Sequence, residues 1–169
     1  STRLSASLLT QIDADFDNSL ERLFSLLRIK SISADPAFAG DCKTAADHLA
    51  KDIATLGFTA EVRPTAGHPA VVARMNGAGA GGRPHVLFYG HYDVQPPDPL
   101  DLWDSPPFEP VLKDDYVYAR GSTDNKGQII SHIFGIQEMI AAHGDLPVNL
   151  HLVVEGEEEV GSDNLPIFL

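Results

Sequence analysis

The sequence predicts an α/β fold of three layers, with helices on both faces of a mostly parallel central sheet. Three observations lead to this prediction. Segments with helical and extended patterns alternate along the chain. The inner extended segments are short apolar runs, which are typical of strands buried on both faces of a parallel sheet. Clusters of polar residues follow several of these runs, and sites in open α/β sheets form where strands end.

The first third of the chain is expected to be helical. Apolar residues recur there at helical spacing, at Leu20, Leu23, Phe24 and Leu27. A second helix is expected over residues 41–56, with Gly57 as its C-terminal cap. Residues 58–63 and 69–75 then have strand patterns, and the Gly-rich residues 77–82 are expected to form a turn that ends a hairpin.

The remaining elements alternate in the same way. Residues 86–89 are expected to be a buried strand, the proline-rich residues 95–110 a loop, and residues 116–119 a short strand. A helix over residues 129–140 should end at His143-Gly144. The near-continuous apolar run 150–154 predicts a central strand. Ser162 is expected to cap a last helix that has Pro166 in its first turn.

Composition limits the function classes. The chain has 169 residues, 43% of them hydrophobic, which is enough for one domain with a core. Twelve basic against 24 acidic residues give a net charge of −12, which argues against nucleic acid and anionic membrane as partners. Cys42 is the single cysteine, so an internal disulfide is excluded and a reducing, cytoplasmic location is expected.

Three polar clusters carry the candidate chemistry. His91-Tyr92-Asp93 follows an apolar run, and residues two apart on an extended strand point to the same side. A carboxylate that accepts the ring N–H of a histidine leaves the other nitrogen free for a metal. The other clusters are residues 120–127, with Asp124, and the acidic residues 155–159. One histidine with several carboxylates suggests a divalent metal: zinc first, with manganese or cobalt as alternatives.

Each cluster also has an ordinary interpretation. Asp93 is also the kind of residue that caps a turn. Asp124 stands where an acid in the first turn of a helix interacts with the helix dipole. The glutamate run is compatible with a solvated turn. Against this last alternative, carboxylates at the tip of a buried strand are costly unless cations compensate them.

Together, the three clusters resemble a known family. Gly-His-Tyr-Asp-Val, Arg-Gly-Ser-Thr-Asp-Asn-Lys-Gly and Glu-Gly-Glu-Glu-Glu-Val-Gly-Ser, in this order and spacing, are similar to motifs of the co-catalytic di-zinc amidohydrolases. That family includes carnosinases, non-specific dipeptidases, aminoacylase, carboxypeptidase G, acetylornithine deacetylase and succinyl-diaminopimelate desuccinylase. The resemblance extends from about Leu20 to the last residue. The segment that contains Trp103 and Phe108 is most similar to the dipeptidase branch.

The resemblance implies a role for each candidate residue. His91 would bind the first metal, Asp93 would orient His91, and Asp124 would bridge both metals. The adjacent glutamate pair of the family precedes Val-Gly-Ser here, so Glu159 would bind the second metal and Glu158 would be the general base, in preference to Glu157. A cis peptide bond after Asp124 is also implied.

The implied activity is hydrolysis of an amide bond in a small peptide by a metal-bound hydroxide. The cofactors would be two divalent ions, with zinc favoured over manganese or cobalt. Deacylation of an N-acyl amino acid is the main alternative, and a non-catalytic metal-binding homologue is another. Residues 1–169 resemble only the N-terminal part of the catalytic domain. By this resemblance the lid and dimerisation domain and the rest of the catalytic domain would lie outside residues 1–169, so a homodimer is expected only of the full-length enzyme, and this chain alone is expected to be inactive.

Overall fold

The computed structural model describes residues 2–77 and 81–169. Its helices are α1 (Thr2–Ala14), α2 (Phe16–Leu27), α3 (Ala39–Ala54), α4 (Lys126–His143) and α5 (Leu165–Phe168), with 3-10 turns at Pro36–Phe38, Leu100–Leu102 and Glu158–Val160. The strands are β1 (Thr59–Arg63), β2 (Ala70–Met75), β3 (His85–His91), β4 (Val111–Lys113), β5 (Tyr116–Tyr118) and β6 (Asn149–Glu155). No helix among the described residues is long and apolar enough to cross a membrane.

The main sheet is mixed. Its strand order is β1-β2-β6-β3, in which β1 and β2 form the expected hairpin, β2 and β6 are antiparallel, and β3 and β6 are parallel. The α/β class is therefore confirmed, whereas the expected predominance of parallel pairs is wrong. A short connection joins β1 to β2, and such a connection allows only an antiparallel pair. Strands β4 and β5 form a separate ribbon.

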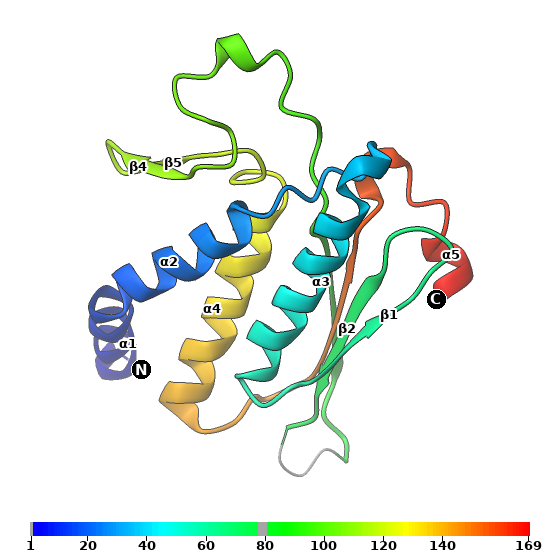
Figure 1. Ribbon diagram of the computed structural model, residues 1–169. Helices are drawn as coiled ribbons and strands as arrows, with labels where there is room; N and C mark the ends of the chain where they lie inside the picture. The colour runs from blue at the N-terminus through cyan, green and yellow to red at the C-terminus, as the bar shows by residue number, and fades with distance from the viewer. Residues whose placement is uncertain (1, 78–80) are drawn as a thin grey trace.

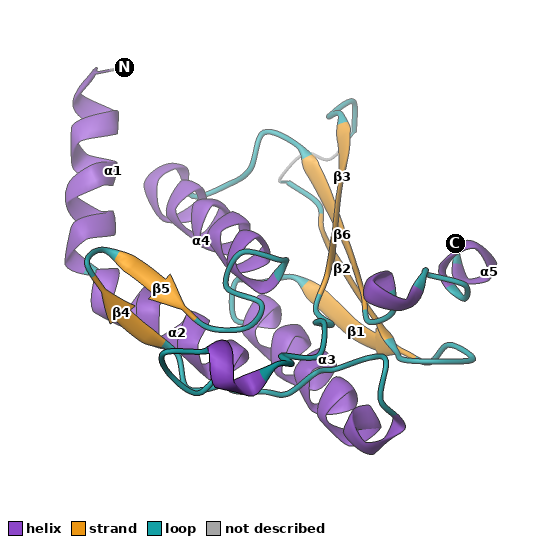
Figure 2. Ribbon diagram, turned by 90° about the horizontal axis from the view of Figure 1, so that it is seen from above, coloured by secondary structure: helices purple, strands orange, loops and turns teal. Residues whose placement is uncertain are grey.

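Helices α2, α3 and α4 lie together on one face of the main sheet (Figures 1 and 2). The core forms between them and β2 and β6, and its buried members include Leu49, Ile53, Val71, Ile133 and Leu152. Only the short α5 and the 3-10 turn Glu158–Val160 lie on the opposite side of the sheet in Figure 2. A second helical layer, which the expected three-layer arrangement requires, is therefore not present among the described residues.

Three local expectations are corrected by the structure. Strand β3 is an edge strand whose Leu87 and Tyr89 are 63% and 47% exposed, so it is not buried on both faces. The Gly-rich segment joins β2 to β3, but these strands are not neighbours because β6 lies between them; residues 78–80 of that segment lie outside the described residues. Ser162 has a left-handed backbone (φ +57) and does not cap α5, which Asn164 precedes.

Candidate metal centre

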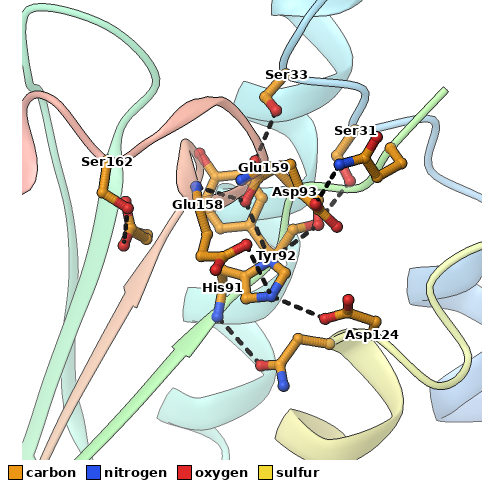
Figure 3. A network of polar contacts seen from close by, with 12 residues as sticks. Ser31, Ser33, His91, Tyr92, Asp93, Asp124, Glu158, Glu159 and Ser162 are labelled. Atoms are coloured by element: carbon orange, nitrogen blue, oxygen red, sulfur yellow. Dashed lines mark hydrogen bonds and ion pairs between the residues drawn. The ribbon is translucent and has the colours of Figure 1, made fainter.

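The three polar clusters meet at one edge of the sheet. Because β3 and β6 are parallel and in register, His91 lies opposite Glu155, and the turn that contains Glu158 and Glu159 begins directly beyond. The segment before α4 brings Asp124 to the same edge (Figure 3). The expectation that these clusters converge is thereby met.

Gly90 allows the Asp124 loop to come this close to β3. A Cβ atom at Gly90 would lie 2.9 Å from Oδ1 of Asn125 and 3.0 Å from Cγ1 of Ile129. The same Oδ1 accepts the backbone N–H of His91 at 3.2 Å. The peptide bond between Asp124 and Asn125 is cis, as the family resemblance implied.

His91, Asp124 and Glu159 form a group that could hold a metal ion. One ligand atom from each lies within 4.8 Å of the others. Nε2 of His91 is 3.0 Å from Oδ1 of Asp124 and 3.7 Å from Oε2 of Glu158. His91 is 6% exposed, whereas the Asp124 side chain is 72% exposed, so the group opens to solvent on the Asp124 side.

Asp93 lies behind this group and is fully buried. One of its carboxylate oxygens is 3.2 Å from Nδ1 of His91, and the backbone carbonyl oxygen of Asp93 is also 3.2 Å from Nδ1, which leaves Nε2 directed at the acidic residues. The Asp93 carboxylate also accepts the backbone N–H groups of Glu158 and Glu159, at 3.2 and 3.1 Å, and the hydroxyl of Ser33, at 2.6 Å. Sequence reasoning gave Asp93 only its contact with His91. Neither the backbone contacts nor Ser33 has a signal in the sequence.

The glutamates of the acidic cluster point in different directions. Glu157 accepts two hydrogen bonds from Asn164, at 2.9 and 3.1 Å, and is not part of the metal group. Glu158 faces His91, and Glu159 lies in the metal group and accepts a hydrogen bond from Gln95 at 2.7 Å. This arrangement favours Glu158 and Glu159 over Glu157 as functional residues.

Glu155 is buried at the end of β6 and has a structural environment of its own. Its Oε1 accepts the hydroxyl of Tyr89 at 2.5 Å and that of Ser162 at 2.8 Å. Burial and the bond to Glu155 raise the pKa of the Tyr89 hydroxyl. The bond between Glu155 and Ser162 thus joins the two ends of the acidic turn. Asp93 binds the backbone of Glu158 and Glu159 between those ends.

Lys126 is a buried structural feature next to the site that the sequence did not reveal. Its ammonium is fully buried and donates to the carbonyl oxygens of Leu26 at 3.1 Å and Ile29 at 2.7 Å. Burial lowers the pKa of Lys126 to about 7. The side chain joins the first turn of α4, next to Asp124, to the end of α2.

The electrostatics of His91 are set by its acidic neighbours. Burial alone would lower the pKa of its imidazole, but the hydrogen bond and charge of Asp93, followed by the charges of Glu158 and Asp124, raise it to about 9. Below that pH, and without a metal, the ring therefore carries a proton and a positive charge. A divalent cation would replace this proton at Nε2 and compensate the same carboxylates.

A cavity of about 690 Å³ lies between the 30–38 segment and the proline-rich loop, and its lining includes Ile32, Phe38, Pro96 and Phe108. No residue of the metal group lines it. Its walls nevertheless adjoin the site, because Ser33 follows Ile32 and Gln95 precedes Pro96. Trp103 stabilises this loop, since its Nε1–H donates to the carbonyl oxygen of Pro97 at 2.8 Å.

The geometry agrees with comparisons to known proteins. Residues 87–166 match the model of the family described as Peptidase family M20/M25/M40. This segment belongs to that family. The succinyl-diaminopimelate desuccinylase of Bordetella parapertussis is 36% identical over 131 residues, which are 78% of this chain and 34% of the relative. The human Beta-Ala-His dipeptidase is 46% identical over 77 residues, which are 46% of this chain and 15% of the relative.

Solved structures of M20 peptidases share the fold. Human carnosine dipeptidase 1 superposes with a TM-score of 0.87 at 29% identity, covering 96% of this chain and 36% of that one. The M20 metallo-carboxypeptidase Sso-CP2 from Sulfolobus solfataricus gives 0.80 at 38% identity, covering 89% and 33%. The chain therefore spans about a third of the length of these proteins. M20 metallopeptidases use divalent metals, and the resemblance found in the sequence is confirmed.

The residues present fit a divalent metal. Two ligands about 2.0–2.1 Å from a tetrahedral zinc ion are about 3.4 Å apart, close to the 3.0 Å between Nε2 of His91 and Oδ1 of Asp124. The donors are one imidazole nitrogen and carboxylate oxygens, a set that suits zinc or manganese. Behind the imidazole, Asp93 supplies the carboxylate that commonly orients a metal-binding histidine.

Proposed function

We propose that this chain forms the N-terminal part of the catalytic domain of a dipeptidase-like hydrolase that uses two divalent metal ions, preferably zinc. The observation that carries the proposal is the convergence of His91, Asp124 and Glu159 on one point. In the proposal His91 would hold the first metal, Glu159 would hold the second, and Asp124 would serve both. Manganese and cobalt are the alternative metals.

Divalent metal ions held by these residues would supply a Lewis acid for the amide carbonyl and would lower the pKa of a water. Glu158 lies outside the group of three ligands, and its Oε2 is 3.7 Å from Nε2 of His91. Its carboxylate can therefore accept a proton from the attacking water and return it to the departing amine. Asp93 holds the His91 ring in a fixed orientation and holds the backbone of Glu158 through its N–H.

The substrate proposed is a small peptide. Human Beta-Ala-His dipeptidase is 46% identical over the matched residues, against 36% for the desuccinylase, and the chain superposes on human carnosine dipeptidase 1 over 96% of its length. The desuccinylase match is longer, with 36% identity over 131 residues, and it supports hydrolysis of an N-acyl amino acid as the second candidate. Both reactions break an amide bond, so the same roles serve either. The cytoplasm is the proposed compartment, on the strength of the single, buried Cys42.

We further propose that residues 1–169 alone do not turn over substrate. Of the three candidate ligands, Asp124 is shared, so each metal would have two protein ligands. Catalytic zinc sites usually have three. Weak metal binding without hydrolysis is therefore expected of the isolated chain, whereas a longer protein that contains it should be active.

The experiment compares three glutamate variants in the full-length protein. Glu158→Gln should retain both metals and lower kcat about 10²–10⁴-fold, because a general base is removed. Glu159→Gln should lose metal by elemental analysis. Glu157→Gln is the matched control, since Glu157 binds Asn164, and it should change neither quantity. Loss of metal from Glu158→Gln but not from Glu159→Gln would reverse the two roles, and wild-type protein without metal or hydrolysis would refute the proposal.

A further inference from the structure

We propose that Ser33 is a positioning residue that acts through Asp93 and thereby fixes His91 and the turn of Glu158 and Glu159 at the same time. The inference rests on the proposed metal centre and adds a residue to it. Ser33 lies in the connection between α2 and α3, about 60 positions from its partner in the sequence.

The Asp93 carboxylate is fully buried, and each of its oxygens has two partners. Oδ1 accepts the N–H of Glu158 at 3.2 Å and lies 3.2 Å from Nδ1 of His91. Oδ2 accepts the N–H of Glu159 at 3.1 Å and the hydroxyl of Ser33 at 2.6 Å. The shortest of these four contacts is the one from Ser33. A buried carboxylate needs such donors, because an unsatisfied charged group in a protein interior is costly.

The bond from Ser33 is one of the contacts that fix how the carboxylate is rotated. The terminal torsion of aspartate is broad and has no strong intrinsic preference. The contacts of the surroundings must therefore select one orientation. Without the Ser33 hydroxyl, Oδ2 would keep only the Glu159 N–H, and the carboxylate could turn away from the geometry that serves both His91 and the acidic turn.

Ser33 is itself held firmly. Its backbone carbonyl is 3.1 Å from Nε2 of His68. The preceding Ile32 forms a parallel bridge with Val94, and the backbone N–H of Val94 donates to Ser31 at 2.9 Å. Ser33 is 8% exposed. Its hydroxyl is therefore presented to Asp93 by a segment held at Ser31, at Ile32 and at the carbonyl of Ser33 itself.

The consequence is coupling between the two proposed metal positions. His91 belongs to one and Glu159 to the other, and Asp93 contacts both. Loss of a single ligand would weaken the position of that ligand first. Loss of the Ser33 hydroxyl should instead weaken both positions together and loosen the backbone of Glu158.

Ser31 provides a matched control in the same segment. It is fully buried, and its hydroxyl also makes one hydrogen bond to the residues that follow β3, at 2.7 Å. Its acceptor, however, is the backbone carbonyl of Tyr92 and not the carboxylate of Asp93. Ser31→Ala and Ser33→Ala thus each remove one buried hydroxyl, but only the second removes a donor to Asp93.

The test is a calorimetric titration of the full-length protein and its variants with zinc alone, together with absorption spectra of the cobalt-substituted protein and unfolding in denaturant. Ser33→Ala should weaken zinc binding about 10–100-fold, as substitutions behind metal-binding histidines commonly do, and should alter the cobalt spectrum. Ser31→Ala should lower stability similarly but keep the affinity and spectrum of the wild type. Ser33→Thr, which retains a hydroxyl, should restore zinc binding.

Wild-type affinity in folded Ser33→Ala would overturn the inference and leave the proposed function intact. An equal loss of affinity in Ser31→Ala would also overturn it, since the effect would then follow stability alone. Failure of the full-length wild-type protein to bind zinc at all would refute the proposed metal centre itself, and the inference with it.

Discussion

Strands β3 and β6 serve two regions of the molecule that are built on different physical principles. On their helix-covered face, Leu152 and its neighbours pack against α3 and α4 in an apolar core. At their carboxyl ends, Asp93 and its partners form a network in which nearly every contact is a directed hydrogen bond or an ion pair. The first region supplies stability through burial, whereas the second fixes geometry.

Two histidines show how far the regions differ. His132 on α4 stacks on Phe88 with ring centroids 3.9 Å apart, and its Nε2 is buried without a hydrogen-bond partner in the described chain. Burial lowers its pKa. His91 is buried as a whole residue, but its acidic neighbours raise its pKa to about 9. Burial opposes the charged form of both rings, and only the nearby carboxylates reverse the outcome.

The largest effect is expected from a cavity in the core. Leu152→Ala should lower the free energy of unfolding by about 2–5 kcal/mol, because the fully buried side chain is removed and its neighbours relax only in part. Zinc affinity of the protein that remains folded should stay unchanged. Denaturant unfolding and zinc titration measure the two quantities.

Asp124→Asn provides the opposite case for the same pair of measurements. The Asp124 side chain is 72% exposed, so the free energy of unfolding should change by no more than about 0.5 kcal/mol. Zinc binding, in contrast, should be lost. If Leu152→Ala weakened zinc binding as strongly as Asp124→Asn, the apolar core and the candidate metal ligands would not contribute separately to stability and to zinc affinity.

A smaller effect separates two glycines of α4. A Cβ atom at Gly127 would lie 1.9 Å from the backbone carbonyl oxygen of Ser122, so the loop that contains Asp124 would have to move. Gly127→Ala should therefore cost about 1–3 kcal/mol and weaken zinc binding. Gly135 has no atom within 4 Å of such a Cβ, and Gly135→Ala should stabilise the helix by about 0.5–1 kcal/mol.

Thermal or denaturant unfolding measures whether Gly127→Ala lowers stability and Gly135→Ala raises it. Equal effects of both substitutions would show that the close approach at Gly127 is not what holds the loop.

The smallest effect is a pH dependence of the metal-free chain. Burial depresses the pKa of His132 below its ordinary 6.5, so the unfolded chain binds a proton that the folded chain does not. The contribution of His132 to stability is therefore present above pH 6.5 and is lost as the pH falls, by at most about 1.4 kcal/mol per pH unit. His48 is shifted in the same direction, also mainly by burial. His132→Phe should flatten the decline in unfolding free energy between pH 6.5 and 5.

His91 should leave this acidic range nearly unaffected, because a ring with a pKa of about 9 is already protonated there. Its titration should instead be visible in zinc binding, which must displace the proton, so that affinity rises with pH up to about 9. His132→Phe should retain that rise. A variant that flattened both profiles would contradict the separation of the two histidines.

Much of this protein follows from its sequence alone. Periodicity identified the helices that became α2, α3 and α4, the β1–β2 hairpin and the central strand β6, because each pattern is local. The left-handed glycines at 57 and 144, which end helical segments, were also recognisable. The motifs predicted the family and the convergence of His91, Asp124 and Glu159, whose catalytic and metal-binding roles stay predictions.

Only the tertiary structure decided how the strands pair and what holds the site together. The edge position of β3 could not be read from its apolar run, because burial depends on which strand lies beside it. The hydroxyl of Ser33, the buried ammonium of Lys126 and the backbone N–H groups on Asp93 reach their partners across 60 to 100 positions of the chain. No local pattern encodes such contacts, since each exists only after the sheet has brought distant segments to one edge.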